Sequence, residues 1–380
     1  IGQARMTRTK HTNIVLDALT IRRGGGLVLL CNLASALAEN SQLRVNVLCN
    51  PQTEVSVLED AGKITVIRPS KTQSALGALV FRLTKLENYL DDIDQQCTVV
   101  TFNSWVKTRH RQITLHINTI PFLPFNERVN SVGYLRAVLL QRASRKALKS
   151  ACLNIFESQY LLDIAKKSYP GEIQNPLVRY FGSDLPRKSA ENLIPQTKRR
   201  SQLITVSSGA KHKQNHKVLQ AFALIRKRHP DLELLVVGNE ALIKQDIVQA
   251  MNGEEISSEG VRYAGYLSRD ELAIEMENSQ ALISLSTTES FYLVAIEAMF
   301  CGTPVIVKRI ASAEESCGQH AILLDDDSAE SVADAYELMQ NSTFWNNKSL
   351  LAHEFAAQFE AVNCMKRISD DIYEVCGNPP

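Results

Sequence analysis

The sequence predicts an α/β protein of two domains, each a parallel sheet with helices on both faces. Short apolar runs of strand length alternate with longer helical segments along most of the chain, a pattern typical of doubly wound parallel sheets. A length of 380 residues suits two hydrophobic cores better than one. Residues 183–201 contain Pro186 and Pro195 and lack a sustained apolar period. We therefore expect an N-terminal domain over 11–182, a linker over 183–201, a C-terminal domain over 202–350 and a helical segment over 351–380.

The bulk composition is that of an ordinary soluble protein, with 22% charged and 44% hydrophobic residues. A formal net charge of +1 argues against nucleic acid as a partner. No apolar run reaches the ~18 residues of a membrane span, and no secretory signal peptide is recognisable. The eight cysteines show no Cys-x-x-Cys spacing, which suits core residues in a reducing compartment. We expect a cytoplasmic protein.

A glycine run follows the first predicted strand. The pattern predicts a strand over 13–19, a helix over 27–39 and a strand over 43–49, with Gly25 and Gly26 in the turn before the helix. Missing side chains there would let a ligand approach the backbone closely. A dinucleotide-binding dehydrogenase is one interpretation, but G-x-G-x-x-G is absent and the second strand ends at Asn50 in place of an acid. A plain tight turn is the other interpretation.

His116 lies at the end of a predicted strand over 112–117, at the edge where parallel sheets place their sites. A lone histidine is more often structural, so this position favours a functional role only slightly. The other elements expected in this domain are strands over 63–67, 98–102, 151–156 and 177–181 and helices over 75–90 and 159–168.

The segment 128–156 contains no acidic residue. Its basic residues are Arg128, Arg136, Arg142, Arg145, Lys146 and Lys149. Leu135, Val138 and Leu139 give it an apolar stripe at helical spacing. Such a helix is able to lie on an anionic membrane surface, and a solvated helix face is an equally weighted interpretation.

The most informative stretch is 281–307, where a short apolar strand, a polar loop, an apolar helix and a second strand form a βαβ unit. Glu289 lies in the loop and Glu297 in the helix. A carboxylate on an otherwise apolar helix is costly unless it has a partner. The backbone amides of Phe291, Tyr292 and Leu293 would be unpaired donors at a helix start, where the dipole also favours an anion.

The spacing Glu289-x7-Glu297, followed by Cys301-Gly302-Thr303-Pro304, resembles the E-x7-E signature of the retaining GT-B glycosyltransferases of family four. That resemblance implies two Rossmann-like domains facing a cleft, with the C-terminal helix crossing back to the first domain. It also implies that Glu289 contacts the donor sugar, that Glu297 bonds the ribose, and that amides after Glu289 hold the diphosphate. Ser290 and Tyr292 stand where the family often has glycines, so we expect a narrower pocket there.

The resemblance extends over the second domain. Lys213 matches the family lysine that contacts the diphosphate, and Ser208 occupies the usual arginine position, which removes one bidentate phosphate partner. Gly238 and Tyr266 stand in the two turns that frame the nucleotide base in the family. In the first domain, His116 and the glycine loop match positions that approach the donor sugar and phosphates.

The resemblance implies transfer of a sugar from a nucleotide-sugar donor, with retained configuration, to a glycan or lipid-linked acceptor in surface polysaccharide biosynthesis. No cofactor is implied, and we expect metal independence because Lys213 and helix-start amides would neutralise the leaving diphosphate. Peripheral attachment to the inner face of an anionic membrane is a further expectation. A non-catalytic nucleotide-sugar-binding protein and a sugar-nucleotide epimerase of the same architecture are the alternatives.

Overall fold

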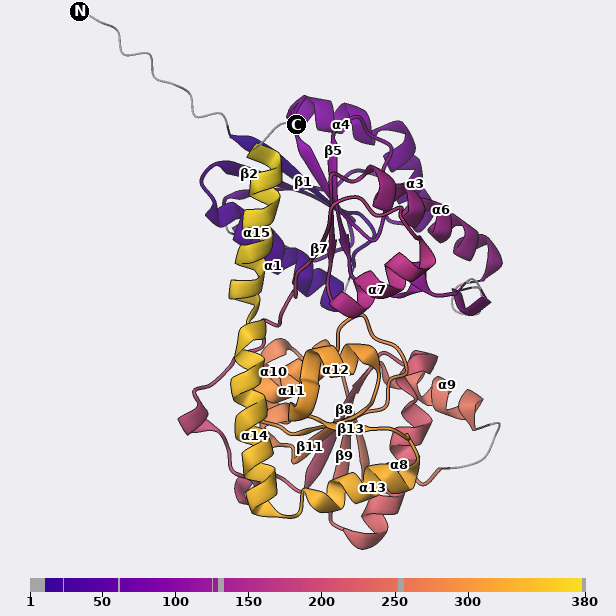
Figure 1. Cartoon of the computed structure of the whole chain (residues 1–380), viewed down its shortest axis with the longest axis vertical. Helices are drawn as coiled ribbons and strands as arrows, with labels where there is room; N and C mark the ends of the chain where they lie inside the picture. Colours follow the sequence, from indigo (N-terminus) through magenta and orange to yellow (C-terminus); the bar gives the residue numbers. More distant parts are fainter. Residues whose placement is uncertain are drawn as a thin grey trace, which may run out of the picture. The chain divides into compact units, whose positions relative to one another are not determined.

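The computed structural model describes residues 11–22, 24–60, 62–124, 126–128, 133–251 and 256–377. The chain forms two compact units (Figure 1). The first runs to Asp184 and resumes at Ala361, and the second comprises Leu185–Glu360. The prediction of an α/β fold with two parallel sheets is confirmed.

The first unit is built on a seven-stranded parallel sheet with strand order β3-β2-β1-β4-β5-β6-β7. Its strands are β1 (Thr12–Ala18), β2 (Leu43–Cys49), β3 (Ile64–Ile67), β4 (Thr98–Phe102), β5 (Arg111–His116), β6 (Leu153–Phe156) and β7 (Pro176–Val178). Its helices are α1 (Gly25–Glu39), α2 (Ser56–Asp60), α3 (Ala75–Thr84), α4 (Leu86–Ile93), α6 (Tyr134–Ser150), α7 (Gln159–Ser168) and α15 (Ala361–Gly377).

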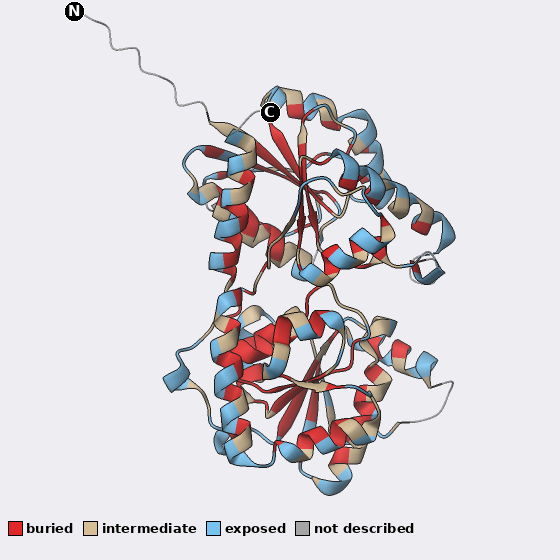
Figure 2. Cartoon of the chain, viewed as in Figure 1, coloured by how far each residue is buried: buried red, intermediate tan, exposed pale blue. Residues whose placement is uncertain are grey.

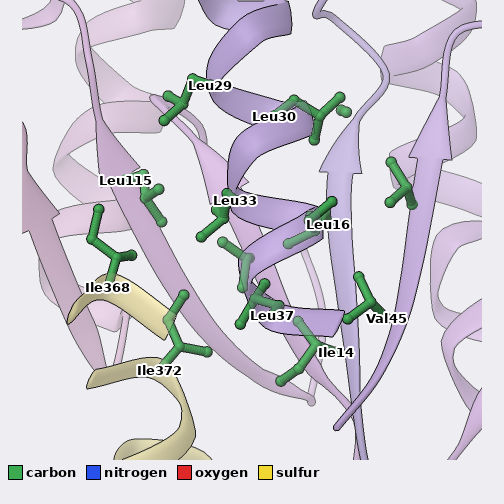
Figure 3. Packing of buried hydrophobic residues seen from close by; sticks show 14 of the residues in the cluster. Ile14, Leu16, Leu29, Leu30, Leu33, Leu37, Val45, Leu115, Ile368 and Ile372 are labelled. Atoms are coloured by element: carbon green, nitrogen blue, oxygen red, sulfur yellow. The ribbon is translucent and has the colours of Figure 1, made fainter. Parts of the chain in front are cut away.

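The alternation of side chains along β1 divides the core of this unit between the two faces of the sheet. Ile14 and Leu16 pack with α1 and α15, whereas Val15 packs with the residues of α3 and α4. Figure 3 shows Ile368 and Ile372 of α15 beside the leucines of α1 over this sheet. The final helix therefore completes a core whose other residues come from the first half of the chain.

The second unit is built on a six-stranded parallel sheet with strand order β10-β9-β8-β11-β12-β13. Its strands are β8 (Gln202–Ser207), β9 (Glu233–Gly238), β10 (Val261–Gly265), β11 (Ala281–Ser284), β12 (Val305–Lys308) and β13 (Ile322–Leu324). Its helices are α8 (Asn215–Arg228), α9 (Glu240–Ala250), α10 (Arg269–Asn278), α11 (Leu293–Phe300), α12 (Ala311–Cys317), α13 (Ala329–Leu338) and α14 (Ser342–Ala356). The central strands of both sheets are buried, as the red ribbons of Figure 2 show.

The end of the chain differs from the expectation of one helical segment over 351–380. Residues up to Ala356 belong to α14 and the second unit, a 3₁₀-turn follows at Ala357–Phe359, and Glu360 is extended. Only from Ala361 does the chain join the first unit, where Arg179 pairs with Asp371 at 2.7 Å. Residues 378–380 of the expected segment lie outside the described residues.

The stretch expected as a linker is folded onto the second unit after Leu185. Arg199 anchors it, since its buried guanidinium donates to the carbonyls of Ser279, Cys301 and Gly302 at 2.9–3.1 Å. These carbonyls follow the ends of α10 and α11, where helices leave acceptors without intrahelical partners. The anchored strand β8 then starts in register with its neighbours.

Candidate functional site

Glu289 and Glu297 both belong to the βαβ unit formed by β11, α11 and β12. Glu289 lies in the loop after β11, and Glu297 lies on α11. Most of α11 is buried on all sides, as its apolar sequence predicts, and Gly302 ends it with a φ of 62°. A helix this buried fixes Glu297 firmly against the core of the unit.

Lys213 and Glu289 form an ion pair. Lys213 Nζ lies 2.6 Å from Glu289 Oε1, and the two side chains are 16% and 17% exposed. The backbone supports this contact, because the amide of Thr287 donates to the carbonyl of His212 at 2.8 Å. The loops after β8 and β11 are therefore tied together where parallel sheets place their ligands. The structure thus brings together two residues predicted for the site.

Glu297 is paired with Arg269, a residue that the sequence analysis did not assign. Arg269 Nη2 lies 2.8 Å from Glu297 Oε1, and only 8% of the Glu297 side chain is exposed. The partner charge explains how a carboxylate persists on an apolar helix. The S-x-x-E capping box of Ser268 and Glu271 marks the start of α10 in the sequence and so places Arg269 at a helix start, but it does not indicate the contact with Glu297.

The start of α11 differs from the prediction of three unpaired amides. The amide of Leu293 donates to the carbonyl of Phe291 at 2.7 Å, across an inverse γ-turn in which Tyr292 has φ −79° and ψ 60°. Leu293 is therefore not the open donor that was expected. The amide of Ala295 donates to the carbonyl of Tyr292, which closes the first turn.

The side chains of Phe291 and Tyr292 point into the unit. The Tyr292 hydroxyl donates to the carbonyl of Ser284 at 3.1 Å and accepts from the amide of Ser286 at 3.2 Å. Burial raises the pKa of this phenol far above its ordinary value. Phe291 packs edge-on against Phe359. The expected narrowing of the pocket by Tyr292 is therefore wrong, because its ring lies beneath the loop.

Ser208 and Tyr266 directly follow β8 and β10, and Gly238 is the last residue of β9. Ser208 is exposed, and Tyr266 is 66% exposed in the turn before α10. Gly238 has a φ of 134°, and a Cβ there would stand 1.8 Å from the Ser207 carbonyl oxygen. Close approach of β8 and β9 therefore requires glycine at this position, and its role toward a nucleotide stays a prediction.

The remaining predicted residues lie in the first unit. Gly25 and Gly26 form the first turn of α1, which begins two residues earlier than expected, and the preceding Gly24 has a φ of 74°. Arg23 of the same loop lies outside the described residues. Neither helical glycine would bring an added Cβ closer than 3.8 Å to another residue, so this turn tolerates side chains sterically.

His116 is the last residue of β5, and it is only 1% exposed. Its Nε2 lies 2.9 Å from Asn154 Oδ1, and its ring stacks on Phe156 with centroids 4.4 Å apart. Burial lowers the pKa of His116 to about 4, although the hydrogen bond with Asn154 opposes that shift. The imidazole is therefore neutral near pH 7, and its predicted contact with a donor stays a prediction.

Among the described residues, one group of side chains has the spacing of metal ligands. Glu87, Asp91 and His110 in the first unit have ligand atoms within 4.8 Å of one another. Their charges are already matched, since Asp91 lies 2.5 Å from Arg109 and 3.1 Å from His110, and Arg109 also approaches Glu87. An ion-pair network accounts for this group.

The basic segment forms α6 for most of its length, and residues 129–132 lie outside the described residues. Leu135 is 73% exposed, and Tyr134 and Leu139 are exposed beside it. Arg142 is exposed further along α6, whereas Arg145 pairs with Glu172 and Lys146 lies 4.3 Å from the Trp105 ring centre. No helix within the described ranges combines the length and apolar character that crossing a bilayer requires.

The family that matches this chain does so within the second unit. Residues 187–348 match the family described as Glycosyl transferases group 1. An uncharacterized 41.2 kDa protein in the cps region of Klebsiella pneumoniae is 37% identical over 108 residues, which cover 27% of this chain and 29% of that protein. The D-inositol 3-phosphate glycosyltransferase of Pseudarthrobacter chlorophenolicus is 29% identical over 126 residues, 32% of this chain and 30% of that enzyme. The alignments thus span under a third of these relatives.

Solved structures match nearly the whole chain at low sequence identity. Sucrose-phosphate synthase of Thermosynechococcus elongatus superposes with a TM-score of 0.73 and 16% identity, over 96% of this chain and 98% of that one. Anabaena Alr3699/HepE in complex with UDP-glucose superposes with a TM-score of 0.70 and 17% identity, over 96% of this chain and 100% of that one. The resemblance inferred from the E-x7-E spacing is confirmed: residues 187–348 match the Glycosyl transferases group 1 family, and the chain has the fold of the GT-B glycosyltransferases.

Proposed function

We propose that this protein is a retaining glycosyltransferase that moves a sugar from a nucleotide-sugar donor to a glycan or lipid-linked acceptor during synthesis of a surface polysaccharide. The Lys213–Glu289 ion pair, at 2.6 Å beside the start of α11, carries this proposal. Support for the donor class comes from Anabaena HepE, which was solved with UDP-glucose. Support for the pathway comes from the relative in the cps region of Klebsiella pneumoniae.

Lys213 supplies the positive charge for the departing diphosphate. A diphosphate bound at Lys213 Nζ would replace Glu289 as its ionic partner. The Glu289 carboxylate would then accept hydrogen bonds from hydroxyls of the donor sugar. Stabilisation of charge that develops on the leaving group is the largest single contribution in reactions of this kind.

Retention follows from attack on the same face of the sugar that the leaving group departs from. The acceptor hydroxyl forms the new bond to the anomeric carbon as the bond to the diphosphate breaks. Its proton passes to a leaving phosphate oxygen, so the diphosphate is both leaving group and base. No side chain is assigned as a covalent nucleophile in this mechanism.

The test is incubation with UDP-, GDP- and ADP-sugars while release of the nucleoside diphosphate is followed with and without glycan and lipid-linked acceptors. One donor class should release nucleotide, at a rate that rises with the right acceptor. Lys213→Ala should abolish that release, whereas Lys244→Ala, which removes a surface partner of Glu240 in the same unit, should not. Binding of a nucleotide sugar without any turnover would identify a non-catalytic binding protein instead.

A lipid-linked acceptor is favoured over a soluble one by the outer face of α6. Exposed Tyr134, Leu135 and Leu139 occupy its first two turns, and exposed basic residues follow them. Apolar side chains beside cationic ones suit the boundary of an anionic bilayer. We therefore propose reversible attachment of the first unit to anionic membranes, where a lipid-linked acceptor is presented.

A further inference from the structure

The two partners of the ion pair between Arg269 and Glu297 differ in how far they are buried. The Glu297 side chain is 8% exposed and the Arg269 side chain 33%, with 2.8 Å between Nη2 and Oε1. The carboxylate is thus enclosed and the guanidinium reaches it from the rim. Removing one partner of such a pair takes away the compensation that it gives to the buried charge.

Arg269 is held in place by its own helix. It is the first residue of α10, directly after Ser268, whose side chain and that of Glu271 form a reciprocal capping box. Leu272, Ala273 and Met276 bury the inner face of α10, which packs against α11. The Cα of Arg269 is therefore fixed relative to Glu297, and the guanidinium needs little ordering to hold the carboxylate.

Arg269 also lies between two parts of the proposed nucleotide site. The turn before it carries exposed Tyr266, a predicted base contact, and its partner Glu297 is the predicted ribose contact. A guanidinium bonded to one carboxylate oxygen restricts rotation of that carboxylate, which fixes the direction of its remaining acceptor sites.

We propose that Arg269 is a positioning residue for nucleotide recognition: it orients Glu297 so that the carboxylate accepts hydrogen bonds from the ribose hydroxyls. This inference rests on the proposed function of the same site. The consequence is selectivity, because a buried carboxylate oriented toward a hydroxyl is left unsatisfied by a nucleotide that lacks it.

The test measures nucleotide affinity by calorimetry, with whichever of UDP, GDP or ADP binds the wild-type protein most tightly and with its 2′-deoxy counterpart. Wild type should prefer the ribonucleotide by about ten-fold or more. Arg269→Ala should weaken binding of the ribonucleotide by about ten-fold and binding of the deoxynucleotide far less, so that the ratio of the two affinities falls toward one. Arg269→Lys should restore part of the ratio.

Arg262→Ala is the matched control. Arg262 also pairs with a glutamate, Glu275 of α10, with 3.7 Å between Nη2 and Oε2. Loss of Arg262 should leave both nucleotide affinities and their ratio unchanged. Glu297→Ala should lose the selectivity as well, and adding Arg269→Ala to it should cause no further loss, because the arginine acts through the carboxylate. Where Arg269→Ala does not fold, Arg269→Gln takes its place.

Three results would overturn the inference. If Arg269→Ala weakens the binding of both nucleotides equally, and its effect adds to that of Glu297→Ala, then Arg269 contacts the nucleotide directly. A lower melting temperature with an unchanged affinity ratio would mean a purely structural pair. If wild type binds no nucleoside diphosphate, the proposed function fails first, and this inference fails with it.

Discussion

Glu289 combines a partner in the structure with a role in the proposed reaction, and Glu289→Gln separates the two. Glutamine keeps the size of the side chain and a carbonyl that accepts from Lys213 Nζ, so the melting temperature should move little. The charge is lost, and we expect turnover to fall by the equivalent of ~2–4 kcal/mol in transition-state stabilisation. Turnover on the identified donor and thermal unfolding are the measurements.

The control for this variant is Glu259→Gln. Glu259 pairs with Arg226 at 3.1 Å on the surface of the same unit, so the same chemical change should affect neither measurement. A folded Glu289→Gln protein that turns over at the wild-type rate would remove Glu289 from the mechanism.

His116 makes the first unit sensitive to acid. Its folded pKa of about 4 lies below the value of 6.5 for an exposed histidine, so the folded state binds the proton more weakly than the unfolded state. The resulting stability is present in full above pH 6.5 and is lost as the pH falls toward 4, on the order of 3 kcal/mol in all. Hydrogen exchange of the β5 amides between pH 7 and pH 4.5 should show this loss.

His116→Gln should flatten that pH dependence, since glutamine does not titrate. The exchange of β8 amides in the second unit serves as the internal reference within the same sample. An unchanged slope for β5 in the variant would mean that other groups, not His116, set the acid sensitivity.

The charged residues of the candidate site could be predicted from the sequence, whereas most of their contacts could not. Glu289, Glu297 and Lys213 are recognisable by spacing, because chemistry restricts which residue types stand there. Arg269 was missed, because its contact with Glu297 joins two helices and no local pattern predicts which side chains meet between them. Tyr292 was misjudged for a similar reason: its hydroxyl finds partners at Ser284 and Ser286 that only the folded loop supplies.

At the scale of elements, buried strands were the most predictable. Strands β2 and β4 have the predicted bounds, because a strand-length run rich in apolar and β-branched residues, flanked by polar turns, leaves little choice. The helix expected over 75–90 is instead divided at Lys85, which has a φ of −127°. The residues that usually break helices are glycine and proline, and neither stands at this position. The amide of Lys85 still donates to the carbonyl of Phe81, which is the i−4 hydrogen bond of the first helix.

Helix α6 is the element that tests membrane attachment. Arg142→Glu combined with Lys146→Glu places two acids on its exposed face and should abolish binding to anionic vesicles, because each basic residue near the surface contributes about 1 kcal/mol. Wild type should co-sediment with such vesicles at low salt and dissociate as salt screens the charges. Release of nucleotide from the donor should not change.

The control pair is Lys166→Glu with Lys167→Glu on α7, which makes the same change in net charge at exposed positions of the same unit. It should weaken vesicle binding only slightly. Failure of the wild-type protein to bind anionic vesicles at low salt would make α6 a solvated face and a soluble acceptor the better hypothesis.

At the scale of the whole molecule, the reaction should proceed without a divalent cation. In the proposed mechanism, Lys213 and the start of α11 provide the positive potential for the diphosphate, so turnover in excess chelator should equal turnover in its absence. A metal-dependent glycosyltransferase assayed alongside shows that the chelator is effective. Loss of activity that Mg²⁺ or Mn²⁺ restores would contradict the assignment of this role to Lys213.

The first unit is discontinuous in the chain, and this has a consequence for its biosynthesis. Met365, Ile368 and Ile372 enter its core, yet they are translated only after the entire second unit. While the ribosome makes those intervening residues, the apolar face of α1 and its sheet stays uncovered, a state that favours misfolding and chaperone binding. The second unit is able to fold as soon as it emerges. The first unit therefore completes its core only after the second unit has been made. A premature stop near residue 360 would destabilise the first unit more than the second.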